Sequence, residues 1–523
     1  MENTLKVTLS DPLVTVKGWT QDLDELGAYV LRRRKTSQEM RLEKEERRML
    51  YGDRARKVLP IENVHKTCLS RDPSDPSTVY FLPGLWPRIK KRLDDTKRPY
   101  EVIDKRNPDI RPPLDMTAFR GIEFRETQDV AVALLSSLDC GIIKTTTGYG
   151  KSQLIGWMCK AYPTLNIVVA TSSTQVVATL YEYISKLLPG EVGMLGGGKD
   201  TSAGKRIVCT TLKSLPNIPP ENVQLVFVDE CHAVGDNLAG RDLTKFCWAR
   251  RFGFSASPVR NDGTALVMES ILGPVILEMS YQEATDAGMV TPMKYLMLPC
   301  DSCPPVAKNP ELPEVMLKRW SYWCNKSRNN VIRRFVYDLK QHYKGQILIF
   351  VSTLEHAVQL NRLLPWFKVA FYGGTDHEQL KRKFPVEKYP GLDLDQYKMT
   401  AKQLDIMRNA FAKGTLRYVI STKVFKQGCN FQNLQVLIRA DGDVSEIEGI
   451  QIPGRLSRLA KGKDYAYLVD IADTFSHWAE QRAQARDKLY RKQQWEPVAY
   501  QELIDELGGA EKSSEGDSGP VRV

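Results

Sequence analysis

The sequence predicts an α/β fold with two tandem parallel-sheet domains and a small α+β domain before them. Three observations carry this prediction. Short apolar runs alternate with helical patterns from about position 118, and a second set of alternating runs begins after about position 325. The part of the chain before these sets holds a short β-α-β pattern and no candidate catalytic group. Such alternation is typical of parallel sheets that are covered on both faces.

The two alternating sets define the domain boundaries. The predicted domains are residues 1–113, 114–298 and 299–507, followed by a Gly/Ser/Glu-rich tail at 508–523 that we expect to be disordered. In the first set we predict strands at 141–143, 165–170, 206–209 and 225–228, and a helix from 175 to 188. In the second set we predict strands at 346–351, 368–372, 418–421, 436–438 and 466–469, with a loop insertion at 376–400.

The N-terminal region is rich in charge. Residues 22–57 predict one long charged helix or two, and residues 79–82, 85–93 and 100–103 predict a strand, a helix and a strand. The basic clusters before residue 57 fit a nucleic-acid grip and a solvated helix face equally well. A proline-rich linker at 107–113 closes the region.

Composition narrows the class of protein. The net charge of +11 favours a polyanionic partner. No apolar run approaches the roughly 18 residues of a membrane span, and the first residues carry no signal-peptide pattern. The ten cysteines are scattered, as in a reducing compartment, so we expect a cytoplasmic protein. Cys300 and Cys303 form the one CxxC, and unpaired thiols are a better interpretation than a zinc site.

A glycine-flanked Lys-Ser pair follows the first predicted strand of the first set. The segment is Thr145, Thr146, Thr147, Gly148, Tyr149, Gly150, Lys151 and Ser152. The two glycines let backbone N–H groups turn toward phosphate oxygens, and the N-terminus of the next helix adds positive charge. We expect Lys151 to reach the β and γ phosphates of ATP and Ser152 to ligate Mg²⁺. The strict pattern has glycine at 145, where this chain has threonine.

Two acidic residues end the apolar run at 225–228. Asp229 is expected to hold the magnesium ion, directly or through water, and Glu230 to polarise the attacking water. Two surface acids at the end of a strand are the alternative. Their place directly after an apolar strand, downstream of the Lys151 loop, makes that alternative poor.

The segments TGYGKS and DECH together resemble a superfamily-2 helicase or translocase, whose fold is two RecA-like domains. Further segments follow in the order of that family. Phe124–Gln128 resembles the adenine-reading segment, with Arg125 and Gln128 as its readers; Ser255–Pro258 resembles the segment that couples hydrolysis to domain motion; Ser421 to Gly428 resembles motif V; Gln451–Arg458 matches QxxGRxxR.

The resemblance also implies roles for residues outside the glycine loop. Arg455 and Arg458 are then the arginine fingers that act on the γ-phosphate, with Gln451 beginning their motif. The residues implied to grip the nucleic-acid backbone are Thr171, Thr211, Arg260, Ser352 and Thr422. Such hydroxyls at strand ends are equally often helix caps.

Departures from the family pattern refine the resemblance. Cys231 and His232 stand where DEAD-box RNA helicases carry Ala-Asp, and Gln451 stands where they usually carry histidine. The segment Ser-Ala-Ser-Pro-Val-Arg resembles repair and branch-migration DNA translocases. Within the superfamily the likeness is to phage helicases of the UvsW type and to xeroderma-pigmentosum-type repair helicases. Asn430 occupies a position where aspartate is common.

The resemblance implies an ATP- and Mg²⁺-dependent DNA helicase that remodels branched DNA in replication, recombination and repair. We expect a monomer without sequence preference, in the host cytoplasm if a phage encodes it, with recombination or replication proteins as candidate partners. The motor subunit of a restriction-type enzyme and an RNA helicase are the alternatives within the superfamily. A non-catalytic nucleic-acid clamp is the alternative from another class, and the intact motifs argue against it.

Overall fold

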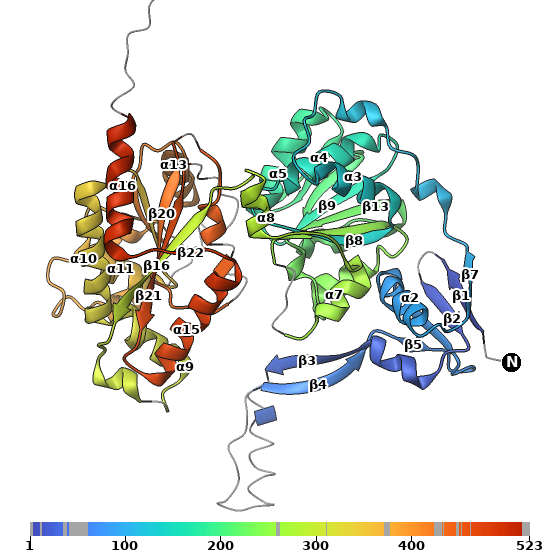
Figure 1. Cartoon of the computed structure of the whole chain (residues 1–523), viewed down its shortest axis with the longest axis horizontal. Coiled ribbons are helices and arrows are strands. Elements are labelled where there is room, and N and C mark those ends of the chain that lie inside the picture. The colour runs from blue at the N-terminus through green and yellow to red at the C-terminus, as the bar shows by residue number, and fades with distance from the viewer. Residues whose placement is uncertain are drawn as a thin grey trace, which may run out of the picture. The chain divides into compact units, whose positions relative to one another are not determined.

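The computed structural model describes most of the chain as two compact units (Figure 1). The described residues are 4–10, 13–34, 39–40, 61–257, 262–309, 311–370, 377–422, 431, 433–445, 449–450, 452–460 and 462–514. One unit comprises Met1–Thr145 with Gly150–Glu278, and the other comprises Thr146–Tyr149 with Met279–Val523. Mixed α/β architecture with largely parallel sheets confirms the predicted fold class. No helix among the described residues is long and apolar enough to cross a membrane.

A small sheet begins the first unit. Its strands, in spatial order, are β5 (Ser70–Arg71), β6 (Thr78–Phe81), β2 (Val14–Lys17), β1 (Leu5–Leu9) and β7 (Tyr100–Asp104). The helix α2 (Trp86–Asp95) packs its buried Ile89 and Leu93 on this sheet, with Val7, Val16 and Val79 opposite. The predicted strand-helix-strand order is therefore present, and β1 and β2 add to it.

A two-stranded hairpin extends from this sheet, and it corrects the prediction of a charged helix over residues 22–57. Residues 21–26 form a 3-10 helix, and β3 (Ala28–Arg34) pairs antiparallel with β4 (Ile61–Thr67). Most of the segment between the two strands lies outside the described residues. The charge pattern of the segment misled the prediction because Tyr29, Val30 and Leu31 favour strand pairing once a partner strand is available.

The hairpin contacts the first parallel-sheet domain at two places. The Tyr29 hydroxyl donates a hydrogen bond to Asp236 Oδ2 at 3.2 Å, and Lys66 forms an ion pair with the same carboxylate. That contact with Lys66 holds the pKa of Asp236 below its usual range. The backbone N–H of Arg32 donates to the Asp262 carbonyl at 2.8 Å. A Cβ on Gly263 would lie 2.0 Å from the Val30 carbonyl oxygen, so only glycine fits there.

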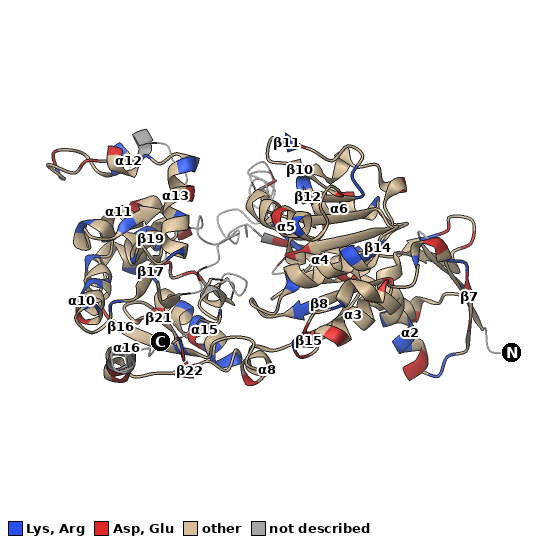
Figure 2. Ribbon diagram, turned by 90° about the horizontal axis from the view of Figure 1, so that it is seen from above, with Lys and Arg blue, Asp and Glu red and all other residues tan. Residues whose placement is uncertain are grey.

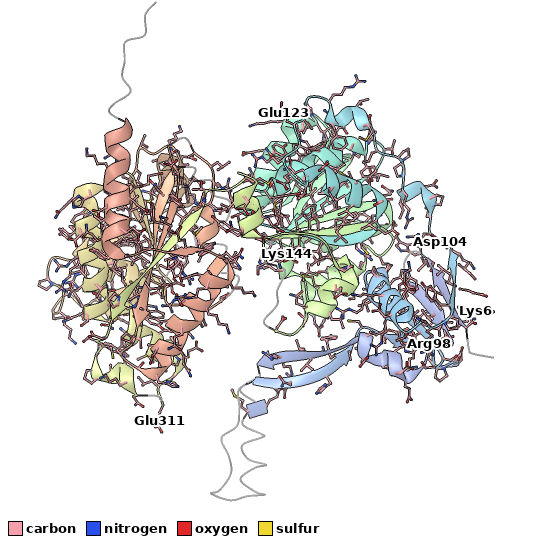
Figure 3. All side chains as sticks on the ribbon, viewed as in Figure 1. Lys6, Arg98, Asp104, Glu123, Lys144 and Glu311 are labelled. Atoms are coloured by element: carbon pink, nitrogen blue, oxygen red, sulfur yellow. The ribbon has the colours of Figure 1, made fainter. Side chains whose placement is uncertain are left out.

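The main sheet of the first unit matches the first predicted set. Its strands, in spatial order, are β11 (Lys199–Asp200), β10 (Val192–Gly196), β12 (Ile207–Thr211), β9 (Ile167–Thr171), β13 (Leu225–Asp229), β14 (Arg250–Ser255), β8 (Cys140–Thr145) and β15 (Val275–Met279). Its helices are α3 (Gln128–Ser137), α4 (Lys151–Ala161), α5 (Thr174–Leu187), α6 (Leu238–Thr244) and α7 (Ala265–Leu272). Lys144 of β8, labelled in Figure 3, forms an ion pair with Glu278 of β15.

Both faces of this sheet are covered. Along β13, Val226 and Val228 face the cluster that contains Met268 and Ile271 of α7. Phe227 alternates with them, is fully buried and packs edge-on against Phe254 at 5.9 Å between ring centroids. A central strand that is apolar on both faces explains why its sequence is a continuous apolar run.

The second unit contains a parallel sheet with the order β18, β19, β17, β20, β21, β16, β22. The strand bounds are β16 (Met293–Cys300), β17 (Gln346–Phe350), β18 (Lys368–Ala370), β19 (Tyr418–Ser421), β20 (Leu434–Arg439), β21 (Ala466–Asp473) and β22 (Glu496–Pro497). The helices are α8 (Tyr281–Asp286), α9 (Glu314–Lys318), α10 (Lys326–His342), α11 (Leu354–Leu363), α12 (His377–Lys383), α13 (Ala401–Ala412), α15 (His477–Lys492) and α16 (Tyr500–Ser514).

Three predicted boundaries differ from the structure of this unit. The boundary at residue 298 falls inside β16, which pairs with β21 along its whole length and so belongs to the second sheet. The insertion at 376–400 is not only loop, since it contains α12 and a 3-10 turn at Asp395–Tyr397. The helix α16 continues to Ser514, past the start of the predicted tail at 508. Leu503, Ile504 and Leu507 are buried against the core and hold this helix in place.

Candidate active site

The glycine loop joins β8 to α4 in the geometry that phosphate binding requires. β8 ends at Thr145 and α4 begins at Lys151. Gly148 and Gly150 have φ angles of +100° and +99°, which side chains other than glycine rarely adopt. A Cβ on Gly150 would lie 2.7 Å from Gln128 Nε2, so a larger residue at this position would also displace the end of the Gln128 side chain. The loop therefore presents backbone N–H groups at the start of a helix, as an anion site does.

The lysine of the loop is already oriented. Lys151 Nζ donates a hydrogen bond to the Thr145 carbonyl at 3.0 Å. The side chain of Thr145 is buried, and its hydroxyl has no hydrogen-bond partner among the described residues. Threonine in place of the first glycine thus leaves the backbone contact intact, because that contact uses a carbonyl group that every residue has.

The predicted adenine-reading segment lies beside this loop. Gln128 is 1% exposed at the first position of α3, and its Oε1 accepts a hydrogen bond from the Arg125 backbone N–H at 2.9 Å. Thr127 before it adopts a left-handed conformation with φ of +66°. The structure brings Gln128 and Gly150 together. The base-reading role of Arg125 and Gln128 stays a prediction.

Asp229 is the last residue of β13, in the middle of the sheet. It is 7% exposed, and burial together with the charge of Glu230 raises the pKa of its carboxyl to about 7, although Lys151 acts in the opposite direction. A buried carboxylate beside a second acid is stabilised when a divalent cation neutralises its charge. Oxygen atoms are the ligands that Mg²⁺ prefers. The chemistry of the Asp229 carboxylate therefore fits magnesium, and the metal-binding roles of Asp229 and Ser152 stay predictions.

A histidine links the second acid to the next strand. Glu230 adopts a left-handed conformation with φ of +54°. His232 Nδ1 lies 3.3 Å from Glu230 Oε2 and 3.2 Å from the Ser255 hydroxyl. The same hydroxyl accepts a hydrogen bond from the Ser257 backbone N–H at 3.2 Å. A contact path thus runs from the predicted water-polarising acid to the segment predicted to couple hydrolysis to motion.

Sequence reasoning used His232 only as a mark of family and missed its place between the two segments. The available signal was a histidine two positions after the acid pair. Because an imidazole can accept or donate at Nδ1, this side chain can respond to a change at Glu230 and transmit it to Ser255. The hydroxyl of Ser255 is fully buried, so nothing but His232 and Ser257 competes for it among the described contacts.

Replacing Asp229 with asparagine is expected to stabilise the nucleotide-free fold. The folded-state pKa lies above the usual 3.8, so ionisation destabilises the fold as the pH rises above about 4 and does so fully above about pH 7. Asparagine removes that charge. Thermal unfolding in EDTA should show a gain at pH 8 of at most about 4 kcal/mol, shrinking toward pH 4. An unfolding temperature lowered at pH 8 would contradict the buried, charged carboxylate.

The predicted nucleic-acid grips lie at the ends of strands. Thr171 and Thr211 are paired neighbours at the ends of β9 and β12. Thr171 is fully buried and its hydroxyl has no hydrogen-bond partner among the described residues, while the Thr211 hydroxyl contacts that of Ser214 at 2.9 Å. In the second unit, Ser352 and Thr422 follow β17 and β19, which are adjacent strands. The role of all four stays a prediction.

The second-unit arginines are only partly described. Gln451, Arg260 and Asn430 lie outside the described residues, and the side chain of Arg455 is likewise not described. The Arg458 carbonyl accepts hydrogen bonds from Thr291 Oγ1 and Lys463 Nζ, each at 3.1 Å. Burial and the charge of Arg458 lower the pKa of Lys463 to about 7. Sequence reasoning missed both supporting residues, because nothing in the local pattern marks them.

Replacing Arg458 with alanine is expected to stop ATP hydrolysis while sparing ATP binding. Thr291 and Lys463 hold its backbone carbonyl, so the alanine variant keeps these contacts and loses only the guanidinium. Turnover and the binding of a fluorescent ATP analogue should be measured separately. Arg491→Ala is the matched control, because Arg491 forms an exposed pair within α15. Loss of nucleotide binding by Arg458→Ala would indicate a structural arginine instead.

The cysteine motif carries no metal site among the described residues. Cys300, Cys303 and Cys324 are free thiols, and burial raises the pKa of Cys300 to about 11. No group of three or more His, Cys, Asp or Glu side chains in the described part of the chain is arranged to hold a metal ion.

Two protein families match two separate segments of the chain. Residues 121–260 match the family described as type III restriction enzyme, res subunit, and residues 327–460 match the helicase conserved C-terminal domain. The first match covers the glycine loop, the DECH segment and Ser255, and the second ends beyond Arg458. Over these two segments the chain resembles the superfamily-2 helicases. Both families indicate an ATP-hydrolysing enzyme.

Two curated proteins are similar to this chain. "Putative helicase 22" of Sulfolobus islandicus filamentous virus is 24% identical over 357 residues, or 63% of this chain and 60% of the relative. The DNA 3'-5' translocase XPB2 of Sulfurisphaera tokodaii is 27% identical over 167 residues, or 31% of this chain and 37% of the relative. The chain therefore spans less than two thirds of either relative.

Two solved helicase structures align with the chain. Dbp5 of S. cerevisiae bound to RNA and ADP BeF3 aligns with 76% of this chain and 95% of its own, at 12% identity and a TM-score of 0.51. T4 UvsW aligns with 95% of this chain and 98% of its own, at 16% identity and a TM-score of 0.39. The tandem RecA-like architecture predicted from sequence is confirmed by the first of these.

Proposed function

We propose that this chain is an ATP- and Mg²⁺-dependent DNA translocase that remodels branched DNA: it migrates junctions, regresses forks and unwinds displacement loops and R-loops. The observation that carries the proposal is the arrangement around β13. A lysine at a glycine loop, a buried aspartate and a glutamate linked through His232 to Ser255 combine a phosphate site with a route for mechanical coupling.

In this proposal each residue acts at a stated point of the cycle. Lys151 leaves the Thr145 carbonyl and holds the β and γ phosphates, while the magnesium ion that Ser152 and Asp229 bind would neutralise charge on them. Glu230 orients and polarises the attacking water. When the γ-phosphate departs, the hydrogen bonds of Glu230 change, and the contact of His232 with Ser255 passes that change to the end of β14. The arginine-finger roles of Arg455 and Arg458 remain part of the proposal.

Nucleic acid would be held at the carboxyl edges of the sheets. Thr211, Ser352 and Thr422 lie at or just after strand ends, where hydroxyl and backbone N–H groups can contact phosphate oxygens. Phosphate contacts carry no base information, so binding should be independent of sequence and weaken steeply with salt. Thr171 can join this set only where its buried hydroxyl becomes accessible.

DNA rather than RNA is favoured by two observations. A relative that shares 167 aligned residues is described as a DNA translocase. The segment that begins at Ser255, the last residue of β14, reads Ser-Ala-Ser-Pro-Val-Arg, and this is the pattern that resembles the repair translocases. The proposed roles of Lys151, Asp229 and Glu230 in hydrolysis are the same for DNA and for RNA, so the choice of nucleic acid does not change the hydrolytic mechanism.

The motor of a restriction-type enzyme is the second candidate. The family matched by residues 121–260 takes its description from the res subunit of such enzymes. The site chemistry is the same in both cases, and the difference lies in a nuclease. Cleavage of supercoiled plasmid by the purified chain with ATP, or on addition of a co-purifying subunit, would favour this candidate over branch remodelling.

The deciding experiment is ATP turnover by the full chain with different nucleic acids. The set is no nucleic acid, single-stranded DNA, duplex DNA, a four-way DNA junction and a single-stranded RNA of matched sequence, with Glu230→Gln as the control for contaminating hydrolases. Strongest stimulation by the junction supports the proposal. Stimulation by RNA alone would replace DNA as the substrate, and equal stimulation by every DNA would refute the preference for branches.

A further inference from the structure

A cationic groove lies in the second unit, and none of the predicted grips lines it. It has a volume of about 1000 Å³ and lies between α10, α11 and the insertion that contains α12. That volume is at the upper limit of the roughly 300–1,000 Å³ that small-ligand sites occupy. The groove is therefore large enough for a ligand longer than one nucleotide.

The charge of the groove is strongly one-sided. Six cations line it: Arg319, Lys326, Arg362, Arg382, Lys383 and Lys388. Glu355 is the one acid among its described lining residues, and it is buried at 3% exposure with Arg319 at 2.8 Å and Lys383 at 3.0 Å. Glu355 thus joins α12 to the wall of the groove and pairs with two of the cations. The remaining cations face a space that suits a chain of negative charges.

Aromatic rings are interleaved with these cations. The guanidinium of Arg362 lies over the Tyr389 ring at 4.7 Å from the centroid, and that of Arg319 lies over Trp320 at 5.2 Å. Both rings are half-buried and line the groove. Arg319 to Trp323 forms a single π-helical turn, a distortion that occurs frequently at functional sites. Rings and arginine planes beside cations are the means by which proteins bind single-stranded nucleic acid without sequence preference.

The position of the groove connects it to the predicted path of nucleic acid. α11 begins at Leu354, directly after Ser352 and Thr353 at the end of β17, and Glu355 is in its first turn. The far wall comes from the segment 377–400, which contains none of the helicase motifs described above. Figure 2 shows α12 outside α11 in that view, with blue Lys and Arg positions on it. The groove is therefore lined by the helix that directly follows the predicted grip at Ser352.

We propose that this groove binds a segment of single-stranded nucleic acid, with phosphates on Lys326, Arg362 and Lys388 and a base against Tyr389. The proposal rests on the proposed nucleic-acid function and adds a site that the strand-end grips do not include. It also gives the insertion a role, which is to close one side of a binding groove. Single-stranded nucleic acid is favoured over an acidic protein segment because the rings accompany the cations.

The test compares two double charge reversals in the full chain. Arg362→Glu with Lys388→Glu changes the groove, and Lys402→Glu with Lys413→Glu makes the same change in charge at α13, outside the groove. The probe is a fluorescein-labelled thymidine 20-mer without nucleotide, from 50 to 200 mM salt, conditions in which phosphate contacts dominate. The groove variant should bind the probe about tenfold more weakly. The slope of log K against log salt concentration should become shallower by about 1.4, or about 0.7 for each lost phosphate contact. The α13 variant should match the wild-type chain.

A second pair of variants tests the stacking role. Tyr389→Leu should weaken binding of the same probe roughly fivefold or more, while Tyr389→Phe should bind as the wild type does, because stacking needs the ring and not the hydroxyl. Equal effects of the two double reversals would overturn the groove assignment. Displacement of the probe by poly-glutamate of matched charge as readily as by unlabelled thymidine 20-mer would overturn it in favour of an acidic protein segment. These results are distinct from failure of the proposed function, which would show as no stimulation of wild-type ATP turnover by any DNA.

Discussion

Replacing Lys151 with alanine is expected to abolish ATP turnover, with a loss of at least about 10²-fold. The Lys151 amine lies 3.0 Å from the Thr145 carbonyl at the base of the glycine loop. Its charge also opposes the rise in the pKa of Asp229 that burial and Glu230 cause. Its removal therefore takes the positive charge from the phosphates and from the buried acid together. Turnover should be measured with and without DNA, beside binding of a fluorescent ATP analogue.

The matched control for this variant is Lys160→Ala. Lys160 lies in the last turn of the same helix, α4, far from the loop that precedes Lys151. A general loss of helix stability would affect both variants, whereas loss of a phosphate contact would affect Lys151→Ala alone. Robust turnover by Lys151→Ala with normal stimulation by DNA would show that the glycine loop is not the nucleotide site.

Replacing Glu230 with glutamine is expected to produce a chain that binds ATP and nucleic acid but turns ATP over about 10² to 10⁴ times more slowly. Glutamine keeps the size of the side chain and loses the charge that polarises water. The variant should accumulate in the bound state, so its affinity for DNA in the presence of ATP should equal or exceed that of the wild type. The measurements are single-turnover hydrolysis and DNA binding with and without ATP.

His232→Gln separates the chemistry of Glu230 from its coupling. If His232 only transmits a change to Ser255, this variant should retain ATP hydrolysis and lose much of its stimulation by DNA. The opposite result, intact stimulation in His232→Gln and rapid hydrolysis by Glu230→Gln, would remove both residues from the proposed mechanism.

The central strands could be predicted because burial on both faces leaves a continuous apolar run. Residues 225–228 predicted a strand that the structure extends only to Asp229, and residues 418–421 predicted β19 in full. The β3–β4 hairpin could not be predicted, since a long segment separates Arg34 from Ile61 and its fit depends on Asp262 and Gly263, which lie far along the chain. β16 was assigned to the wrong domain because only its partner β21 decides which sheet it joins.

Part of the candidate site could be predicted from the sequence and part could not. Contiguous motifs located Lys151, Asp229 and Glu230, because their chemistry depends on neighbours in sequence. Other contacts join residues that are distant in the sequence, namely His232 with Ser255 and Thr291 with Arg458. Lys463, which also holds Arg458, is a buried lysine that lies beyond the motif. No local pattern encodes such contacts. The same holds for the cationic groove, whose lining comes from separate segments of the chain.

The docking of β3 and β4 has a consequence for cooperativity. Asp236 and Asp262, which follow the DECH segment and the end of β14, both contact the hairpin, so the N-terminal sheet and the first parallel sheet share part of their stability. Regions tied together in this way open as one cooperative unit. Hydrogen exchange in mild denaturant should show the amides of β1 and β13 becoming exposed together. In a shortened chain that starts at residue 114, the β13 amides should be the first to lose protection from hydrogen exchange. That result would mean that the N-terminal domain stabilises the folded state of the first parallel-sheet domain.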